Sequence, residues 1–162
     1  MEGAKGAFRL GPMAYWLLKT EPETYSIEDL RREGRAIWDG VRNYQARNYL
    51  LRMGEGDLCF IYHSSTNPPG IAGLARVVQT RIPDPTQFDP ESPYFDPRAT
   101  PERPRWYTVE VAFLEAWPLI PLKELKALFP PDHPLVKRGN RLSVMPVPPE
   151  VAERLIGWKG SR

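Results

Sequence analysis

Prolines interrupt this 162-residue chain in a way that limits which folds it can adopt. Nineteen residues are proline, and seven of them lie between Pro83 and Pro104. Proline has no backbone N–H to donate and its ring clashes with a preceding helical turn, so this stretch forms neither a regular helix nor a central strand. So long an irregular segment inside one domain is usually functional or a packed lid. We therefore expect a compact domain with a long loop in its second half.

Strands and helices are predicted on the N-terminal side of that loop. Strands are expected at residues 14–20, 57–63 and 71–80, and helices at 27–33 and from about 43 to 53. Ser26 followed by Asp29 resembles a capping box for the first helix, which Gly34 ends. The turn-forming residues 64–70 join the second and third strands.

The C-terminal side of the loop predicts the remaining elements. Residues 106–117 alternate as a half-buried strand does, and a helix at 122–129, a strand at 141–147 and a helix from Pro149 to Ile156 follow. Trp16 and Trp117 lie in strand-like runs and are expected in the core. Because strands and helices mix without regular βαβ alternation, the expected class is α+β, a small mixed barrel with short helices around it.

The composition indicates one soluble globular domain inside the cell. Residues 1–12 lack periodicity and are interpreted as an N-terminal tail, which leaves residues 13–160 for the domain. No window approaches the ~20 apolar residues of a membrane span, and no signal peptide is recognisable. Cys59 is the single cysteine, which excludes an internal disulfide and fits a reducing compartment. A cytoplasmic location follows as the expectation.

Charge is distributed unevenly, although the net charge of +2 is too mild to imply strong nonspecific binding of nucleic acid. Residues 31–52 hold six arginines against two acids, and residues 137–141 add three cations. Residues 83–105 instead hold five acids against three arginines. If the two basic stretches share one face, that face could follow a phosphate backbone; the alternative is a solvated helix surface.

Several kinds of catalytic site are not supported. His63, His133 and Cys59 are scattered singly, whereas a catalytic zinc needs three or four ligands at workable spacing, so no metal site is expected. His63 and Ser64 are neighbours on a strand and point to opposite faces, so they cannot form a nucleophile–base pair. A phosphate-binding glycine loop is also missing from the sequence. Asp39 and Glu21 could form a carboxylate pair if they converge.

Five ordered stretches of sequence carry a resemblance to a known family. They are residues 15–22 (YWLLKTEP), 38–48 (WDGVRNYQARN), 62–73 with its YHS and PGIAG motifs, 106–111 (WYTVEV) and 141–147 (RLSVMPV). Together they resemble the EVE domain, and the likeness covers residues 14–158. The resemblance implies a PUA-like β-barrel surrounded by helices, similar in layout to YTH domains, which hold a methylated base in an aromatic cage.

The same resemblance implies where a modified base of DNA or RNA would bind. The implied pocket is lined by residues 19–21, residues 38–44 and the turn at His63 and Ser64. In YTH domains a cage tryptophan lies in a segment similar to residues 37–39, so Trp38 is the first choice of stacking residue.

The residue types in these segments also suit a base, which needs an aromatic plane on its face and polar groups on its edge. The predicted base-binding pocket comprises Lys19, Glu21, Trp38, Val41, Asn43, Tyr44, His63, Ser64 and Trp106, and the predicted phosphate contacts are Arg42, Arg47 and Arg141. Simpler roles stay open for several of them: core packing for Trp38, helix capping for Asn43, a hydrogen-bonded strand histidine for His63 and a surface position for Lys19.

These observations predict a protein that reads a modified base in nucleic acid, without a cofactor and without breaking a bond. Two alternatives remain. One is an enzyme acting on a nucleobase or nucleotide, with Glu21 or Asp39 as base and Lys19 as electrostatic stabiliser. The other is a groove for a protein partner. The sequence does not distinguish DNA from RNA as the ligand. It also specifies neither the modified base nor the oligomeric state.

Overall fold

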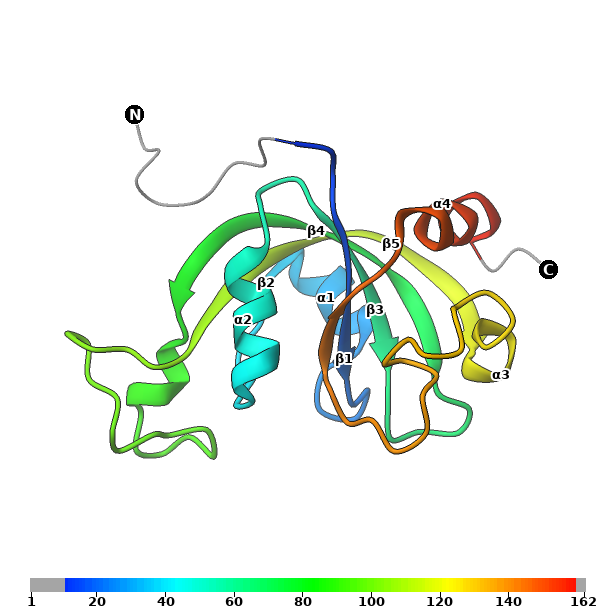
Figure 1. Cartoon of the computed structure of the whole chain (residues 1–162). Coiled ribbons are helices and arrows are strands. Elements are labelled where there is room, and N and C mark those ends of the chain that lie inside the picture. The colour runs from blue at the N-terminus through cyan, green and yellow to red at the C-terminus, as the bar shows by residue number, and fades with distance from the viewer. Residues whose placement is uncertain (1–10, 160–162) are drawn as a thin grey trace.

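One mixed sheet of six strands runs through the molecule in the order β2-β5-β4-β3-β1-β6 (Figure 1). The computed structural model describes residues 11–159, so most of the expected tail at residues 1–12 lies outside the described residues. The strands are β1 (Tyr15–Thr20), β2 (Arg35–Ile37), β3 (Leu58–His63), β4 (Gly70–Pro83), β5 (Tyr107–Pro121) and β6 (Val144–Pro146). The helices are α1 (Ile27–Glu33), α2 (Tyr44–Arg52), α3 (Leu122–Leu125) and α4 (Pro149–Trp158), with a 3₁₀ turn η2 at Pro85–Phe88.

The sheet is mixed because β1 pairs parallel with β3, whereas every other neighbouring pair is antiparallel. β4 and β5 arch across the whole molecule (Figure 1). The predicted α+β class is confirmed. The closed barrel is not: β2 and β6 are the two edges, and the paired strands of residues 11–159 form an open sheet. Each edge strand has three residues, and no strand pairing joins β2 to β6 within the described residues.

Three elements on the C-terminal side, β5, α3 and β6, differ in length from the prediction. β5 continues to Pro121, beyond the predicted end at Trp117. β2 pairs with β5 at residues 110–112, so the later part of β5 lies at an edge of the described sheet, where Pro118 removes no ladder hydrogen bond. The helix predicted at 122–129 is one turn, Leu122–Leu125, and the strand predicted at 141–147 is three residues long.

α1 is fixed at both ends by the residues that predicted it. The Ser26 hydroxyl accepts from the Asp29 N–H at 3.1 Å, and the Asp29 carboxylate accepts from the Ser26 N–H at 2.8 Å. Gly34 follows with a φ of +83°, a left-handed conformation that glycine adopts without strain. His63, at the end of β3, accepts from the Ile27 N–H through Nε2 at 3.1 Å, which fastens the start of α1 to the sheet.

The core lies between the curved sheet and the helices, with Leu17, Phe60 and Met145 completely buried. Trp16 and Trp117 are buried as predicted. The Trp16 ring N–H donates to the buried Asp57 carboxylate at 2.9 Å, so the polar atom of this large side chain is satisfied inside the core.

The proline-rich segment leaves the sheet after β4 and returns to it at β5 as an extended loop on one side of the molecule (Figure 1). Gln87 in η2 is fully buried and holds the two ends of this loop together. Its side-chain oxygen accepts from the N–H groups of Arg105 and Trp106 at 2.9 and 3.0 Å. Its amide donates to the carbonyls of Asp84 and Trp106, both at 2.8 Å.

Within residues 11–159, no helix is long and apolar enough to cross a membrane. The same residues contain no group of three or more His, Cys, Asp or Glu side chains that could hold a metal ion. Cys59 is buried, and burial raises the pKa of its thiol far above the usual range.

Candidate nucleic-acid interface

A cavity of about 1100 Å³ opens at the end of β1, beside the start of α1. Segments far apart in the sequence meet around it: the exit of β1, the approach to α1, residues 36–42, the β3–β4 turn, the proline-rich loop and residues 140–143. Five predicted base-binding residues line it, namely Lys19, Glu21, Trp38, Val41 and Ser64, together with two predicted phosphate contacts, Arg42 and Arg141. A cavity of this size accommodates a nucleotide.

Trp38 is both packed in the core and part of the cavity wall. Its side chain is largely buried, and its ring meets that of Tyr25 edge-on, with centroids 6.1 Å apart and planes at 84°. Its N–H donates to the Val109 carbonyl at 2.9 Å, and its carbonyl accepts from the Thr108 hydroxyl. The two roles that the sequence left open for Trp38 are therefore compatible.

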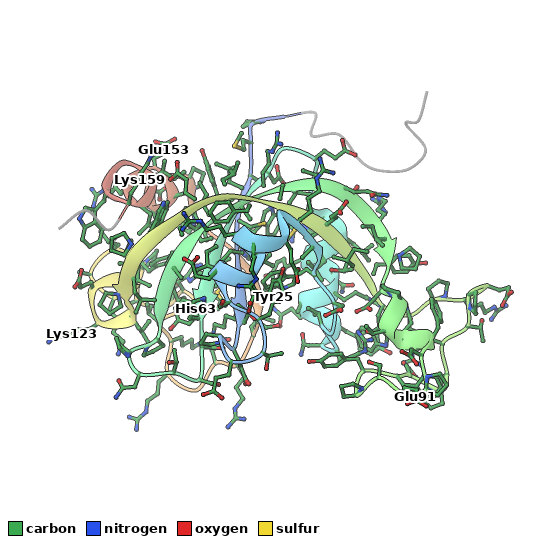
Figure 2. All side chains as sticks on the ribbon, turned by 180° about the vertical axis from the view of Figure 1, so that it is seen from behind. Tyr25, His63, Glu91, Lys123, Glu153 and Lys159 are labelled. Carbon is green, nitrogen blue, oxygen red and sulfur yellow. The ribbon has the colours of Figure 1, made fainter. Side chains whose placement is uncertain are left out.

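Tyr25 is a wall residue that the sequence did not indicate. It immediately precedes the capping box of α1, and its carbonyl accepts from the Thr20 hydroxyl at 2.7 Å. Its own hydroxyl donates to the Glu33 carboxylate at 2.6 Å. Burial and the neighbouring Glu33 raise the pKa of Tyr25, so the phenol stays protonated at neutral pH. In Figure 2, Tyr25 and His63 lie in the middle of the molecule near α1.

Lys19 brings a positive charge into the cavity. Its side chain is half-buried, and its Nζ lies 5.6 Å from the centroid of the Tyr62 ring. Burial lowers the pKa of the Lys19 ammonium. Within the described chain Nζ has no hydrogen-bond or ion-pair partner, whereas the backbone N–H of Lys19 donates to the Ser143 carbonyl at 2.9 Å. The ammonium group is therefore free to meet an acceptor on a ligand.

Glu21 and Ser64 belong to a second wall, where the β3–β4 turn is fastened to the end of β1. The Ser64 N–H donates to the Thr20 carbonyl at 2.9 Å, and the Ser65 hydroxyl donates to the Glu21 carboxylate at 3.2 Å. His63 does not line the cavity, because its ring faces the start of α1.

A third wall follows Trp38 along the chain. Asp39 lines the cavity, and its pKa is raised by burial and by the nearby Asp84 carboxylate, with Arg42 opposing the shift. Asp84 is buried and accepts from the Gly40 N–H at 2.8 Å. Of the two carboxylates Asp39 and Asp84, Asp39 is the one that lines the cavity.

Arg42 joins this wall to the proline-rich loop, and its N–H groups donate to acceptors within the protein. Its guanidinium donates to the carbonyl of Tyr94 from both Nε and Nη2, at 3.0 and 2.8 Å. It also donates to the Val41 carbonyl, the Asp84 carboxylate and the Thr86 hydroxyl at 2.9 to 3.0 Å. A guanidinium has five N–H donors, so none is left over for a phosphate in this arrangement.

Four residues predicted for the site lie elsewhere. Asn43 caps α2, accepting from the Ala46 N–H at 2.9 Å through its side-chain oxygen. Tyr44 stacks on Trp106 with ring centroids 4.9 Å apart and planes at 17°, and Arg47 lies beside them. None of the four lines the cavity. The structure thus divides the aromatic residues that the sequence placed in one cage.

The two basic stretches meet at the cavity, where Arg42 of the first and Arg141 of the second both line the wall. Arg31 and Arg32 pair with acids of their own helix, and Arg42 is bound to Asp84. In the second stretch, Arg141 is exposed and lines the cavity, next to Asn140. Of the arginines that line the cavity, Arg42 is thus bound to a carboxylate, and Arg141 in the loop before β6 has no ion pair within the described residues.

Comparison with known proteins places the chain among relatives along nearly its whole length. Residues 14–158 match the model of the EVE domain family. Human thymocyte nuclear protein 1 is 39% identical over 85% of this chain and 70% of the human protein. The mouse protein of the same name is 45% identical, and the matched part covers 55% of it. These curated relatives are therefore longer than the part that matches.

Several solved structures are also similar to this chain. A Pseudomonas syringae protein is 48% identical with a TM-score of 0.85, covering 90% of this chain and 99% of that one. The human THYN1 protein in complex with 5-methylcytosine-containing DNA is 36% identical with a TM-score of 0.81, covering 92% and 99%. A Toxoplasma CPSF4 YTH domain in complex with m6A-modified RNA, 15% identical over 93% and 95%, has a TM-score of 0.56 and shares the fold. The predicted resemblance is thus confirmed, and this chain belongs to the EVE domain family.

Proposed function

We propose that this chain binds nucleic acid carrying a modified base, with that base turned out of its strand into the cavity beside Trp38. The observation that carries the proposal is this cavity in a chain 36% identical to a human protein crystallised with 5-methylcytosine-containing DNA. Turning a base out costs a few kcal/mol, which contacts inside the cavity must offset. DNA with a 5-methylcytosine is therefore the ligand to test first.

The cavity offers contacts for both the face and the edge of such a base. Trp38 and Tyr25 supply aromatic surface, and stacking is worth ~1–3 kcal/mol per base. The Lys19 ammonium can donate to a ring nitrogen or carbonyl, and the Asp39 carboxylate can accept from the exocyclic amine of cytosine. A methyl group in an apolar site discriminates by ~1–3 kcal/mol, so the preference for a modified base should be tens to a few hundredfold.

The phosphate backbone has a partner in Arg141 at the cavity mouth. This side chain is exposed and forms no ion pair within the described chain, so its guanidinium is available to grip two phosphate oxygens. Arg42, predicted for the same role, instead positions the cavity wall in our proposal because its donors are occupied.

The test compares DNA oligonucleotides that carry one 5-methylcytosine or one cytosine at the same position. Trp38→Leu should lose the preference for the modified base, whereas Trp117→Leu should keep it. Trp117 is the matched control because it is a similarly buried tryptophan that lines a different hollow. The proposal fails if the unaltered chain shows no preference, or if folded Trp38→Leu retains it in full.

The enzymatic alternative has one observation in its favour, the raised pKa of Asp39 in the cavity wall. A carboxyl group poised in this way can act as a general base or acid. Incubating the chain with modified and unmodified nucleotides and DNA, and separating the products, tests it. Product formation that disappears in Asp39→Asn would replace the binding proposal with an enzyme acting on a nucleobase.

A further inference from the structure

An exposed, stacked aromatic pair lies outside the cavity. Tyr44 begins α2 and is 47% exposed, whereas the Trp106 ring beneath it is 6% exposed. Their near-parallel planes, 4.9 Å apart at the centroids, leave the outer face of Tyr44 without another ring on it among residues 11–159. We refer to Tyr44 and Trp106 as the aromatic platform.

The platform is held rigidly from below. The backbone of Trp106 is fixed at its N–H and its carbonyl by the buried Gln87 amide. The Trp106 ring N–H donates to the Asp96 carboxylate at 2.8 Å. The Tyr44 hydroxyl accepts from the Arg105 guanidinium, which also pairs with Asp96. A flat surface fixed in advance costs little conformational entropy when a ligand stacks on it.

Positive charge surrounds the platform and leaves the Tyr44 side chain about half-exposed. The Arg47 guanidinium lies 4.6 Å from the Tyr44 centroid and 5.9 Å from the Trp106 centroid. The Arg105 guanidinium also lies over the Tyr44 ring, 5.8 Å from its centroid, and Tyr44 nevertheless stays 47% exposed, so part of its surface is open to a ligand. Arg47 uses three of its five donors on Asn48 and the Arg105 carbonyl, all neutral acceptors. Its charge therefore has no carboxylate partner in the described chain.

Arg42 connects the platform to the cavity. It lines the cavity, and its guanidinium lies 5.3 Å from the Trp106 centroid. Successive nucleotides of a stacked strand rise about 3.4 Å, so a strand with one base in the cavity brings a nearby base over Tyr44 within a few nucleotides. Of the acids of the proline-rich loop, Asp96 lies at the platform, where it is bound to the Trp106 ring N–H and to Arg105, and Glu91 lies on the part of the loop that Figure 2 labels.

From this geometry we infer a second contact with nucleic acid: a base flanking the extruded one stacks on Tyr44, while Arg47 faces the adjoining phosphate. The inference rests on the proposed function, because it assumes that the strand is the ligand. Stacking on an aromatic plane tolerates every base, so the platform contributes affinity for the strand and the cavity contributes preference for the modification.

The experiment measures dissociation constants for DNA of about 12 nucleotides with one 5-methylcytosine or one cytosine, using Tyr44→Ala, Tyr44→Leu and Tyr44→Phe. Tyr44→Leu keeps apolar bulk over Trp106 but removes the ring, whereas Tyr44→Phe keeps the ring. Leu114→Ala is the control, since Leu114 is an exposed apolar residue at the other hollow. A fluorescent 2-aminopurine placed at each flanking position reports stacking directly.

We expect Tyr44→Ala and Tyr44→Leu to weaken binding of both oligonucleotides by about 5- to 100-fold, with the preference for 5-methylcytosine unchanged. Tyr44→Phe and Leu114→Ala should bind as the unaltered chain does. At one flanking position, the fluorescence of 2-aminopurine should be quenched by the unaltered chain and by Tyr44→Phe. It should not be quenched by Tyr44→Ala or Tyr44→Leu.

Two results overturn the inference. Unchanged affinity in Tyr44→Leu shows that nothing stacks there, and loss of the 5-methylcytosine preference in that variant shows that Tyr44 serves the cavity instead. If the unaltered chain binds both oligonucleotides equally, the proposed preference for a modified base is wrong. The comparison of Tyr44→Leu with Tyr44→Phe still tests whether a base stacks on Tyr44. If the unaltered chain binds neither oligonucleotide, both proposals fall.

Discussion

The ring of Tyr94 lies so close to the α-carbon of Gly40 that a β-carbon there would come within 2.8 Å of it. The carbonyl of the same tyrosine accepts two hydrogen bonds from Arg42. The proline-rich loop is thereby pressed against the cavity wall at a position where a side chain would force it away.

Gly40→Ala should therefore both destabilise the chain and disturb the cavity. Gly40 has a φ of +88°, and an L-residue in the left-handed region costs about 1–2 kcal/mol. Displacing the Tyr94 ring should cost about 1–3 kcal/mol more. Urea denaturation and DNA binding measure the two effects.

The control is Gly34→Ala, because Gly34 has a φ of +83° but open space around its α-carbon. It carries the backbone strain without the clash and should leave DNA binding intact. Equal losses of stability in the two variants would show that the Tyr94 contact is easily relieved.

Lys19→Met should weaken DNA binding by about tenfold or more, since a hydrogen bond to a charged group contributes about 1.5–3 kcal/mol. Lys123→Met removes an exposed lysine at α3, far from the cavity lining, and should have no such effect. Titration of labelled DNA into each variant gives the comparison. Matching losses in both would indicate a general effect of net charge.

The same lysine predicts how binding depends on pH. Burial lowers the Lys19 pKa from its ordinary value of 10.5, and the ammonium is charged below its pKa. Affinity should thus fall as pH rises from about 7 toward 10, earlier than an ordinary lysine would dictate. Lys19→Arg should remove this fall because a guanidinium stays charged throughout.

Stability should decrease in mild acid because of the two histidines. Burial lowers the pKa of both His63 and His133 below the ordinary 6.5. The unfolded chain therefore binds protons first, so this contribution is present above about pH 6.5 and is lost as pH falls through the lowered pKa values. Each ring accepts a backbone N–H, from Ile27 and Leu135 respectively, which a proton would displace.

Chemical denaturation at pH values from about 7.5 to 5 measures this dependence. His133→Gln and His63→Gln should each flatten the curve of unfolding free energy against pH, whatever they do to stability at neutral pH. An unchanged slope in both variants would falsify the assignment to these histidines.

Gln87→Leu should lower the free energy of unfolding by at least about 2 kcal/mol. The substitution brings a similar volume but removes the acceptor of the Arg105 and Trp106 N–H groups, at about 1–3 kcal/mol each, while the Asp84 and Trp106 carbonyls keep backbone donors. Gln79→Leu, at a half-buried position on β4, should cost less. Urea midpoints of the two variants give the comparison.

The elements that the sequence predicted well carry their own start and stop signals. Ser26, Asp29 and Gly34 bound α1 at the predicted residues, and Asn43 caps α2 as one of its two suggested roles. β2 was missed because its three residues have no pattern of their own. It is a strand because β5 pairs with it.

The cavity was predicted in part. The resemblance to the EVE domain brought Lys19, Glu21 and Trp38 together, and all three line the cavity. Tyr94 joins them through hydrogen bonds to a residue 52 positions away, which no local pattern reveals. Tyr44 lies outside the cavity lining because its ring stacks on Trp106, which follows the proline-rich loop in the sequence.

The bonds that hold this loop have a consequence for how the site can change. Arg42 grips the carbonyl of Tyr94, and Gln87 grips main-chain atoms at both ends of the loop. Every residue supplies a backbone carbonyl, so a hydrogen bond to that carbonyl does not depend on which side chain the accepting residue carries. The Tyr94 side chain, which lines the cavity, can therefore change while its carbonyl keeps this part of the loop in place, so ligand preference can change at this position with little risk to the course of the loop.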